Sequence, residues 1–204
     1  MLTSSIKSYT GGMFATNGYL LDTPEGLIVI DAPLGISSLI PEDVTPLALL
    51  LTHQHFDHVD DAAVLAARGA KLYAFSPYDP ALILAEDARR WGVPTDPAPF
   101  EVHEILKDQS QLSLAGLDLS LLHVPGHSPD SLCYHLADAG IIFGGDTLFQ
   151  GSVGRTDLPG GQHRIFIDEI RSKLLTLPPE TTVYPGHGPT TTIAAETAQN
   201  QSLA

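Results

Sequence analysis

The stretch Thr52-His53-Gln54-His55-Phe56-Asp57-His58 places three histidines and one aspartate within six positions. In an extended segment, side chains two positions apart project from the same face, so the rings of His53 and His55 can reach one ion together. This spacing favours a metal site over a surface loop that is merely rich in histidine.

The sequence on either side of this stretch sets its place in the fold. Residues 47–51 form a short apolar run, typical of a buried strand, and residues 60–67 are typical of the opening of a helix. The motif is therefore expected on a strand-to-helix loop, where Asp57 and His58 can point away from the first histidine pair.

Strand and helix patterns alternate along the rest of the chain. Apolar runs bounded by turn residues predict further strands at residues 13–22, 27–31, 71–75, 112–114, 118–124, 131–136, 141–143 and 181–184. Helical patterns occur at residues 36–40, 79–91 and 161–177, the last with Ile165, Ile170 and Leu174 on one side, and from Ala194 onward. This order predicts an α/β fold in which two sheets share a core and helices lie outside.

Three later residues of metal-binding type each follow a predicted strand. They are His127 in Pro-Gly-His-Ser-Pro, Asp146 in Gly-Gly-Asp-Thr and His187 in Pro-Gly-His-Gly-Pro. Glycine and proline beside a ligand allow a tight backbone to approach a bound ion closely. Each segment alone is weak support, but their shared position at strand ends, together with the first motif, favours a metal site.

Length and charge narrow the class of protein. A chain of 204 residues with 43% hydrophobic content can bury one sizeable core, so we expect one domain over residues 1–204. The net charge of −14, with only ten Lys and Arg, argues against a nucleic-acid partner. Residues 1–7 lack the apolar core of a signal peptide, and no apolar run is as long as a membrane span.

The remaining reactive residues have ordinary explanations. The single cysteine, Cys133, precludes a disulfide within the chain and fits a cytoplasmic location, and its apolar neighbours predict a buried side chain. Arg89 and Arg90 are expected at a solvated helix end. Four histidines lack the setting of the metal motifs and are expected at the surface or with partners in the core: His103, His123, His135 and His163.

A known family shares this set of residues in this order. The seven residues that carry the resemblance are His53, His55, Asp57, His58, His127, Asp146 and His187, and together they resemble the metallo-β-lactamase superfamily. Residues 145–149 and 151–161 resemble its glyoxalase II (hydroxyacylglutathione hydrolase) branch, especially short bacterial members. The resemblance implies an αββα sandwich of two mixed sheets.

Two departures qualify the resemblance. Longer glyoxalase II enzymes have a C-terminal helical domain that holds much of the glutathione, whereas only seventeen residues follow His187 here, so we expect that domain to be absent. In addition, Asp146 stands where the main classes of zinc β-lactamase carry cysteine, which counts against a β-lactamase.

The resemblance also implies how the ligands are shared. In that family, the equivalents of His53, His55 and His127 hold one ion, those of Asp57, His58 and His187 hold a second, and that of Asp146 bridges both. Nitrogen and carboxylate donors fit Zn²⁺ best and also allow Fe or Mn. The implied reaction is attack of a metal-bound hydroxide on an acyl thioester similar to S-lactoylglutathione, with Asp57 and Asp146 as catalytic residues.

Some alternatives stay open on the sequence. Arg155 and Thr156 are candidates for binding an anionic substrate, although Arg155 can equally form a structural ion pair with Asp157. A related family, the persulfide dioxygenases, uses one Fe(II) on residues that match His53, His127 and Asp146. A lactonase or another ester hydrolase is a further possibility, a non-catalytic binding module is disfavoured because no ligand is missing, and no oligomeric state is predicted.

Overall fold

The first sheet is built around apolar strands that are buried on both faces, as parallel strands at the centre of a sheet require. In a computed structural model that describes residues 6–203, its strands lie in the order β1 (Ile6–Gly11), β2 (Thr16–Thr23), β3 (Gly26–Ile30), β4 (Ala48–Leu50), β5 (Lys71–Ala74) and β6 (Glu104–Ile105). The first three strands pair antiparallel, and β3 to β6 pair parallel. Most of the N-terminal segment that bears on a signal peptide lies outside the described residues.

The second sheet is mostly antiparallel. Its order is β14 (Thr191–Thr192), β13 (Thr182–Pro185), β10 (Ile141–Gly145), β9 (Leu132–Leu136), β8 (Leu117–His123) and β7 (Gln111–Leu114). Only β10 and β13 pair parallel. A small separate hairpin of β11 (Leu148–Phe149) and β12 (Ser152–Val153) follows β10.

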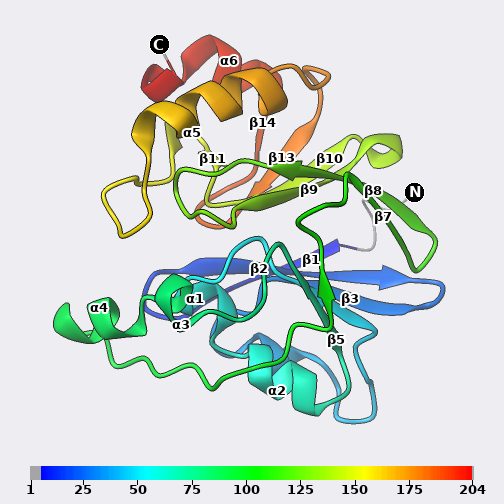
Figure 1. Cartoon of the computed structure of the whole chain (residues 1–204). Coiled ribbons are helices and arrows are strands. Elements are labelled where there is room, and N and C mark those ends of the chain that lie inside the picture. Colours follow the sequence, from blue (N-terminus) through cyan, green and yellow to red (C-terminus); the bar gives the residue numbers. More distant parts are fainter. Residues whose placement is uncertain (1–5, 204) are drawn as a thin grey trace.

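Helices cover the outer faces of both sheets (Figure 1). The first half of the chain supplies η2 (Ile36–Leu39), α1 (Phe56–Val59), α2 (Ala62–Ala67), α3 (Pro80–Ile83) and α4 (Ala85–Arg90). The second half supplies η3 (Ala137–Ala139), α5 (His163–Glu169), the π-helical turn η4 (Ile170–Leu174), α6 (Ile193–Gln199) and η5 (Gln201–Leu203). In Figure 1, α5 and α6 lie above the second sheet and α2 lies below the first.

Three groups of buried side chains correspond to the three interfaces of this arrangement. Tyr134 and Phe143 belong to the group between the sheets, and Leu49 and Leu65 to the group between the first sheet and its helices. Phe166 belongs to the group between the second sheet and its helices. The αββα sandwich implied by the sequence is thus confirmed.

The N-terminal hairpin differs from its prediction. The strand expected at 13–22 begins at Thr16, because Gly12 and Ala15 adopt positive φ angles of 69° and 53° and form a turn after β1, which the sequence did not reveal. The turn leaves Met13 and Phe14 exposed, with 71% and 44% of their surfaces accessible.

Two predicted helices are interrupted. The helix expected at 79–91 breaks at Leu84, whose φ of 56° ends α3 and lets its side chain turn inward, where it is buried. The helix expected at 161–177 is α5 continued by η4, and its buried face is formed by Phe166, Ile170 and Leu174, four positions apart. Ile165 is 43% exposed, so its expected place on that face is wrong.

Among the described residues, the structure contains no helix that is both long and apolar enough to cross a membrane.

Candidate metal centre

The candidate ligands lie where strands of both sheets end. His53 and His55 follow β4, while Asp57 and His58 lie on α1. The three later candidates follow strands of the second sheet: His127 lies in the loop after β8, Asp146 directly after β10, and His187 two residues after β13. Because the sheets are packed face to face, these strand ends meet at one edge of the sandwich.

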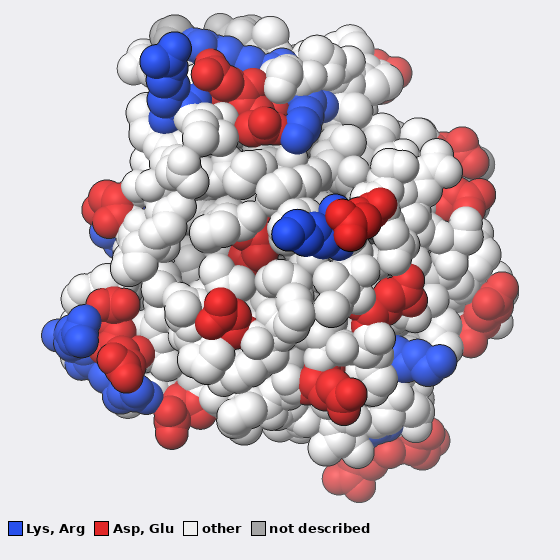
Figure 2. Space-filling model, in the orientation of Figure 1, with Lys and Arg blue, Asp and Glu red and all other residues white. Residues whose placement is uncertain are grey.

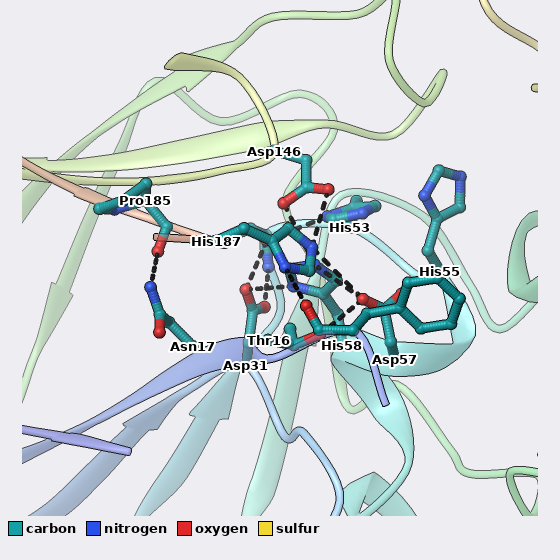
Figure 3. Close-up of polar contacts among 12 residues, drawn as sticks. Thr16, Asn17, Asp31, His53, His55, Asp57, His58, Asp146, Pro185 and His187 are labelled. Atoms are coloured by element: carbon teal, nitrogen blue, oxygen red, sulfur yellow. Dashed lines mark hydrogen bonds and ion pairs between the residues drawn. The ribbon is translucent and has the colours of Figure 1, made fainter. Parts of the chain in front are cut away.

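All seven candidate side chains converge, as the sequence pattern predicts. Their ligand atoms form three overlapping groups, each within 4.8 Å: His53 with His55 and His127, His53 with His58 and Asp146, and Asp57 with His58 and His187. Figure 3 shows Asp146 approaching the histidine rings from the second sheet, opposite Asp57.

The carboxylate of Asp146 lies between the two outer groups. Its Oδ2 is 3.4 Å from His127 Nε2 and 3.3 Å from His187 Nε2, and its Oδ1 is 3.2 Å from His58 Nε2. The carboxylate thus lies close to ligand nitrogens of both groups, as a bridging ligand must.

Several candidate ligand atoms at the centre of the cluster have no hydrogen-bond partner. His53 Nε2, His58 Nε2 and Asp146 Oδ1 are fully buried and unsatisfied. Buried polar atoms without partners are costly, at about 1–3 kcal/mol each, so native proteins rarely keep them without a purpose. Binding of cations would satisfy all three atoms, and the residues therefore fit a metal centre.

Hydrogen bonds on the far side of each ring fix which nitrogen faces the cluster. His58 Nδ1 donates to Asp31 Oδ2 at 2.8 Å, His127 Nδ1 to the carbonyl of Arg155 at 2.7 Å, and His187 Nδ1 to the carbonyl of Phe14 at 3.1 Å. Because these acceptors cannot donate, each Nδ1 carries a proton, and Nε2 is the nitrogen left to bind a metal ion.

The first two histidines are arranged differently from each other. His53 Nδ1 lies 3.1 Å from Thr52 Oγ1, which itself donates to Asp31, so His53 also presents Nε2. His55 instead turns Nδ1 toward the cluster, 2.9 Å from His127 Nε2. His53 and His55 thus present different ring nitrogens, Nε2 and Nδ1, to the same ligand group.

Asp31 is a residue of this centre that the sequence did not reveal. It is 2% exposed, has a positive φ of 55°, and accepts hydrogen bonds from the Thr52 backbone N–H, the Thr52 hydroxyl and His58. It thereby links the end of β3 to the histidine loop. A positive φ at a residue other than glycine is uncommon and would have marked Asp31, but it is visible only in the structure.

The electrostatics of the cluster keep the first histidine group neutral. Burial and neighbouring histidines lower the pKa of His55 to about 3 and hold the pKa values of His53 and His127 below the usual range. Neutral imidazole is the form that binds a metal ion.

In the second group, which consists of Asp57, His58 and His187, the charged neighbours affect the pKa values more than burial does. Burial lowers the pKa of His187, but the Asp146 and Asp57 carboxylates outweigh it and raise this pKa to about 10. For Asp57 the signs are reversed. Burial alone would raise its pKa, but His58 and His187 outweigh burial and lower this pKa to about 2. The pKa of Asp146 also lies below its usual range, so the Asp57 and Asp146 carboxylates are both ionised and available to a cation.

Gly186 shows how closely the backbone approaches this centre. A Cβ atom at this position would lie 2.1 Å from Asp146 Oδ1 and 2.7 Å from His58 Cε1, closer than any side chain tolerates. Asn17 holds the same turn by donating to the carbonyls of Pro185 and Gly188. The glycine predicted to allow a close approach does so.

The two candidate substrate-binding residues lie beside the cluster. The Arg155 guanidinium makes two hydrogen bonds to Asp157, at 2.7 and 2.8 Å, and lies 6.0 Å from the centre of the Trp91 ring. Thr156 Oγ1 contacts His163 at 3.2 Å. The ion pair that the sequence left open for Arg155 is therefore present, and it is exposed to solvent.

The other histidines stay outside the cluster. His103 Nδ1 accepts from the Leu72 N–H, His123 bonds to the carbonyl of Pro129, and His135 is buried in β9. None of them, nor His163, belongs to a metal-competent group of the described residues. Cys133 is buried, as predicted.

A comparison with known families decides the identity of the fold. The family model of the Metallo-beta-lactamase superfamily matches residues 11–187, which span all seven candidate ligands. The chain belongs to the metallo-beta-lactamase superfamily. The resemblance inferred from the seven residues is thereby confirmed.

Individual members of the superfamily are similar over most of the chain. Hydroxyacylglutathione hydrolase GloC of Haemophilus influenzae is 37% identical, over 79% of this chain and 77% of that protein. The crystal structure of BLEG-1 B3 metallo-beta-lactamase has a TM-score of 0.86 at 36% identity, covering 97% of this chain and 99% of that one. The structure of TTHA1623 in a di-iron-bound form has a TM-score of 0.81 at 36% identity, covering 96% and 98%.

The geometry and the relatives agree on the kind of centre. The convergent histidine and aspartate side chains, together with a similar structure that binds two iron ions, support a binuclear site for divalent metals. Membership of this superfamily supports an enzyme of the hydrolase type.

Proposed function

We propose that the chain is a hydrolase with two metal ions, most plausibly Zn²⁺, that cleaves an acyl thioester of the S-lactoylglutathione type. The observation that carries the proposal is the position of Asp146 between two groups of nitrogen and carboxylate donors. The similarity to hydroxyacylglutathione hydrolase GloC supports the choice of substrate.

In this proposal, His53, His55 and His127 hold one ion, Asp57, His58 and His187 hold the other, and Asp146 contacts both. When bound, the two cations supply Lewis acidity and lower the pKa of a bound water toward about 7. The protein keeps its own donors in place through the Nδ1 hydrogen bonds and through Asp31.

Asp57 is suited to orient the attacking water. Its Oδ2 accepts a hydrogen bond from Thr16 Oγ1 at 2.7 Å and lies 3.4 Å from His187 Nε2, so the carboxylate cannot rotate freely. A carboxylate that is ionised and fixed at the centre can accept a proton from water as the water attacks.

The reaction adds water across the bond between the carbonyl carbon and sulfur. The water oxygen becomes part of the carboxylic acid product, the C–S bond breaks, and the sulfur leaves as a thiol. Thiolates are good leaving groups, so the protein need not supply a strong general acid at this step.

Charge favours an anionic substrate near the centre. Two dications exceed the charge of the Asp57 and Asp146 carboxylates, so the loaded centre is locally positive although the whole chain has a net charge of −14. In this proposal, Arg155, which lines the cavity over the cluster, and its neighbour Thr156 would bind a carboxylate of the thiol part, and Asp157 would leave Arg155 when the substrate binds.

Two other reactions compete with this proposal. A persulfide dioxygenase would need one iron on three ligands, which leaves the convergence of His55, Asp57, His58 and His187 unexplained. Opening of a β-lactam ring is favoured by the similarity to BLEG-1 B3 metallo-beta-lactamase. An ester or lactone would react by the same chemistry as a thioester.

The test compares these substrates on one preparation of metal-loaded protein. We expect thiol release from S-lactoylglutathione, followed with a thiol reagent, without oxygen uptake on glutathione persulfide and with slower opening of a chromogenic cephalosporin. Oxygen uptake without thiol release, or faster β-lactam opening, would overturn the thioesterase proposal.

A further inference from the structure

Two cavities adjoin at the candidate centre. The first, here called the metal cavity, lies over the cluster and is walled by aromatic and aliphatic side chains, among them Phe14, Phe56, Leu84 and Trp91. The second, here called the side cavity, has a volume of about 260 Å³ and is lined by one of the seven candidate ligands, Asp57. Phe14, Phe56 and Asp57 line both cavities, so the two cavities are neighbours at the candidate centre.

The side cavity is lined largely by apolar groups. Its walls include Met13 and Leu34, which are 71% and 56% exposed, together with the buried Val93 and the exposed Pro94. The Phe14 and Phe56 rings meet edge to face, 5.5 Å apart, and both rings line both cavities. Large apolar side chains that stay exposed together beside a catalytic centre are typical of a binding surface.

Charge separates the two cavities further. Arg155 lines the metal cavity, whereas none of the described lysines and arginines lines the side cavity. The side cavity carries the carboxyl groups of Asp57, Asp60 and Asp96, of which Asp96 is paired with Arg89 at 2.9 Å. Asp60 accepts a hydrogen bond from Thr95, so its charge remains at the cavity wall. An anionic group would be repelled there, while an uncharged apolar group would bury hydrophobic surface.

We propose that the side cavity binds the acyl part of the substrate and that this part is uncharged and apolar. The inference rests on the proposed function for the orientation of the substrate: the carbonyl lies at the metals, the charged thiol part lies toward Arg155, and the acyl chain enters the side cavity. The enzyme then prefers acyl groups larger and more apolar than lactoyl.

The experiment measures the preference for chain length in two ways. The first is kcat/KM for S-acetylglutathione and S-hexanoylglutathione, and the second is Kd for acetate and hexanoate, the products, by calorimetry on metal-loaded protein. Because each fully buried methylene is worth up to about fourfold, we expect the hexanoyl compound and hexanoate to be favoured at least about tenfold.

Variants locate the preference in the side cavity. The double substitution Met13→Ser and Leu34→Ser should reduce the ratio of hexanoyl to acetyl in both measurements to about two or less, since it removes the apolar wall. The matched control is Leu39→Ser, because Leu39 is similarly exposed at 51% but lines neither cavity, and its ratio should equal that of the wild type.

The outcomes separate this inference from the proposed function. Equal values for the short and long compounds in the wild type, or an unchanged ratio in the double variant, would overturn the role of the side cavity. Failure to hydrolyse any thioester, with hexanoate still bound tightly only when Met13 and Leu34 are intact, would overturn the thioesterase and support the side cavity.

Discussion

At the scale of single residues, the ligands depend on side chains that never contact the proposed metals. Asp31 holds His58 and, through Thr52, His53, so one carboxylate orients rings of both ligand groups. The ligands themselves could be predicted because histidine and aspartate at strand ends are chemically distinctive. Asp31 could not be predicted, because in the sequence it is only the first polar residue after an apolar run, and its partners become visible in the three-dimensional arrangement.

Asp31→Asn should weaken metal binding by about 10- to 100-fold, the usual effect of losing a partner that orients a histidine ligand. Asparagine tolerates the positive φ of 55° at this position, so the backbone should keep its course. The measurement is a competition titration against a chelator. Asp22→Asn, at the exposed end of the otherwise buried β2, is the control, and an affinity for metal unchanged by Asp31→Asn would contradict the orienting role.

At the scale of elements, helix α6 fixes the segment that follows Asp146. Glu196 is 3% exposed and accepts hydrogen bonds from the Gly151 N–H, from Thr191 Oγ1 and from Asn200 Nδ2. Gly151 lies in the turn between β11 and β12, a few residues before the Arg155 carbonyl that orients His127. The C-terminal helix therefore supports the second sheet's side of the centre.

Glu196→Ala should lower the free energy of unfolding by about 3 kcal/mol, because it removes a charged acceptor of three hydrogen bonds and leaves the buried Thr191 hydroxyl without that acceptor. Urea denaturation of the metal-free protein measures this loss without interference from ligand binding. Glu180→Ala is the matched control because Glu180 is exposed. Equal stability of the two variants would show that the Glu196 network contributes nothing.

The strands and helices differ in how far the sequence predicts them. The apolar strands β3, β4, β8 and β9 could be predicted because the order of apolar residues in their sequences indicates which side chains are buried. The two-residue strands β6, β11, β12 and β14 have no pattern of their own and exist only through their partners. The break at Leu84 likewise serves a tertiary contact, since Leu84 lines the metal cavity.

At the scale of the whole molecule, the αββα arrangement brings ends of strands from both sheets to one edge. Residues from position 53 to position 187 meet there because β4, β10 and β13 all end on that side. Figure 2 shows acidic side chains spread over the face drawn, with basic side chains at few places. With the net charge of −14, the absence of a nucleic-acid partner stays a prediction of the sequence.

The number of metal ions per chain tests the central claim most directly. The protein should be purified without chelator, supplied with Zn²⁺, freed of excess ions and measured by elemental analysis against protein concentration. We expect close to two ions per chain in the wild type and a clear loss in Asp146→Ala, because the bridging carboxylate serves both groups. One ion per chain in the wild type, or two ions retained by Asp146→Ala, would contradict the binuclear centre bridged by Asp146.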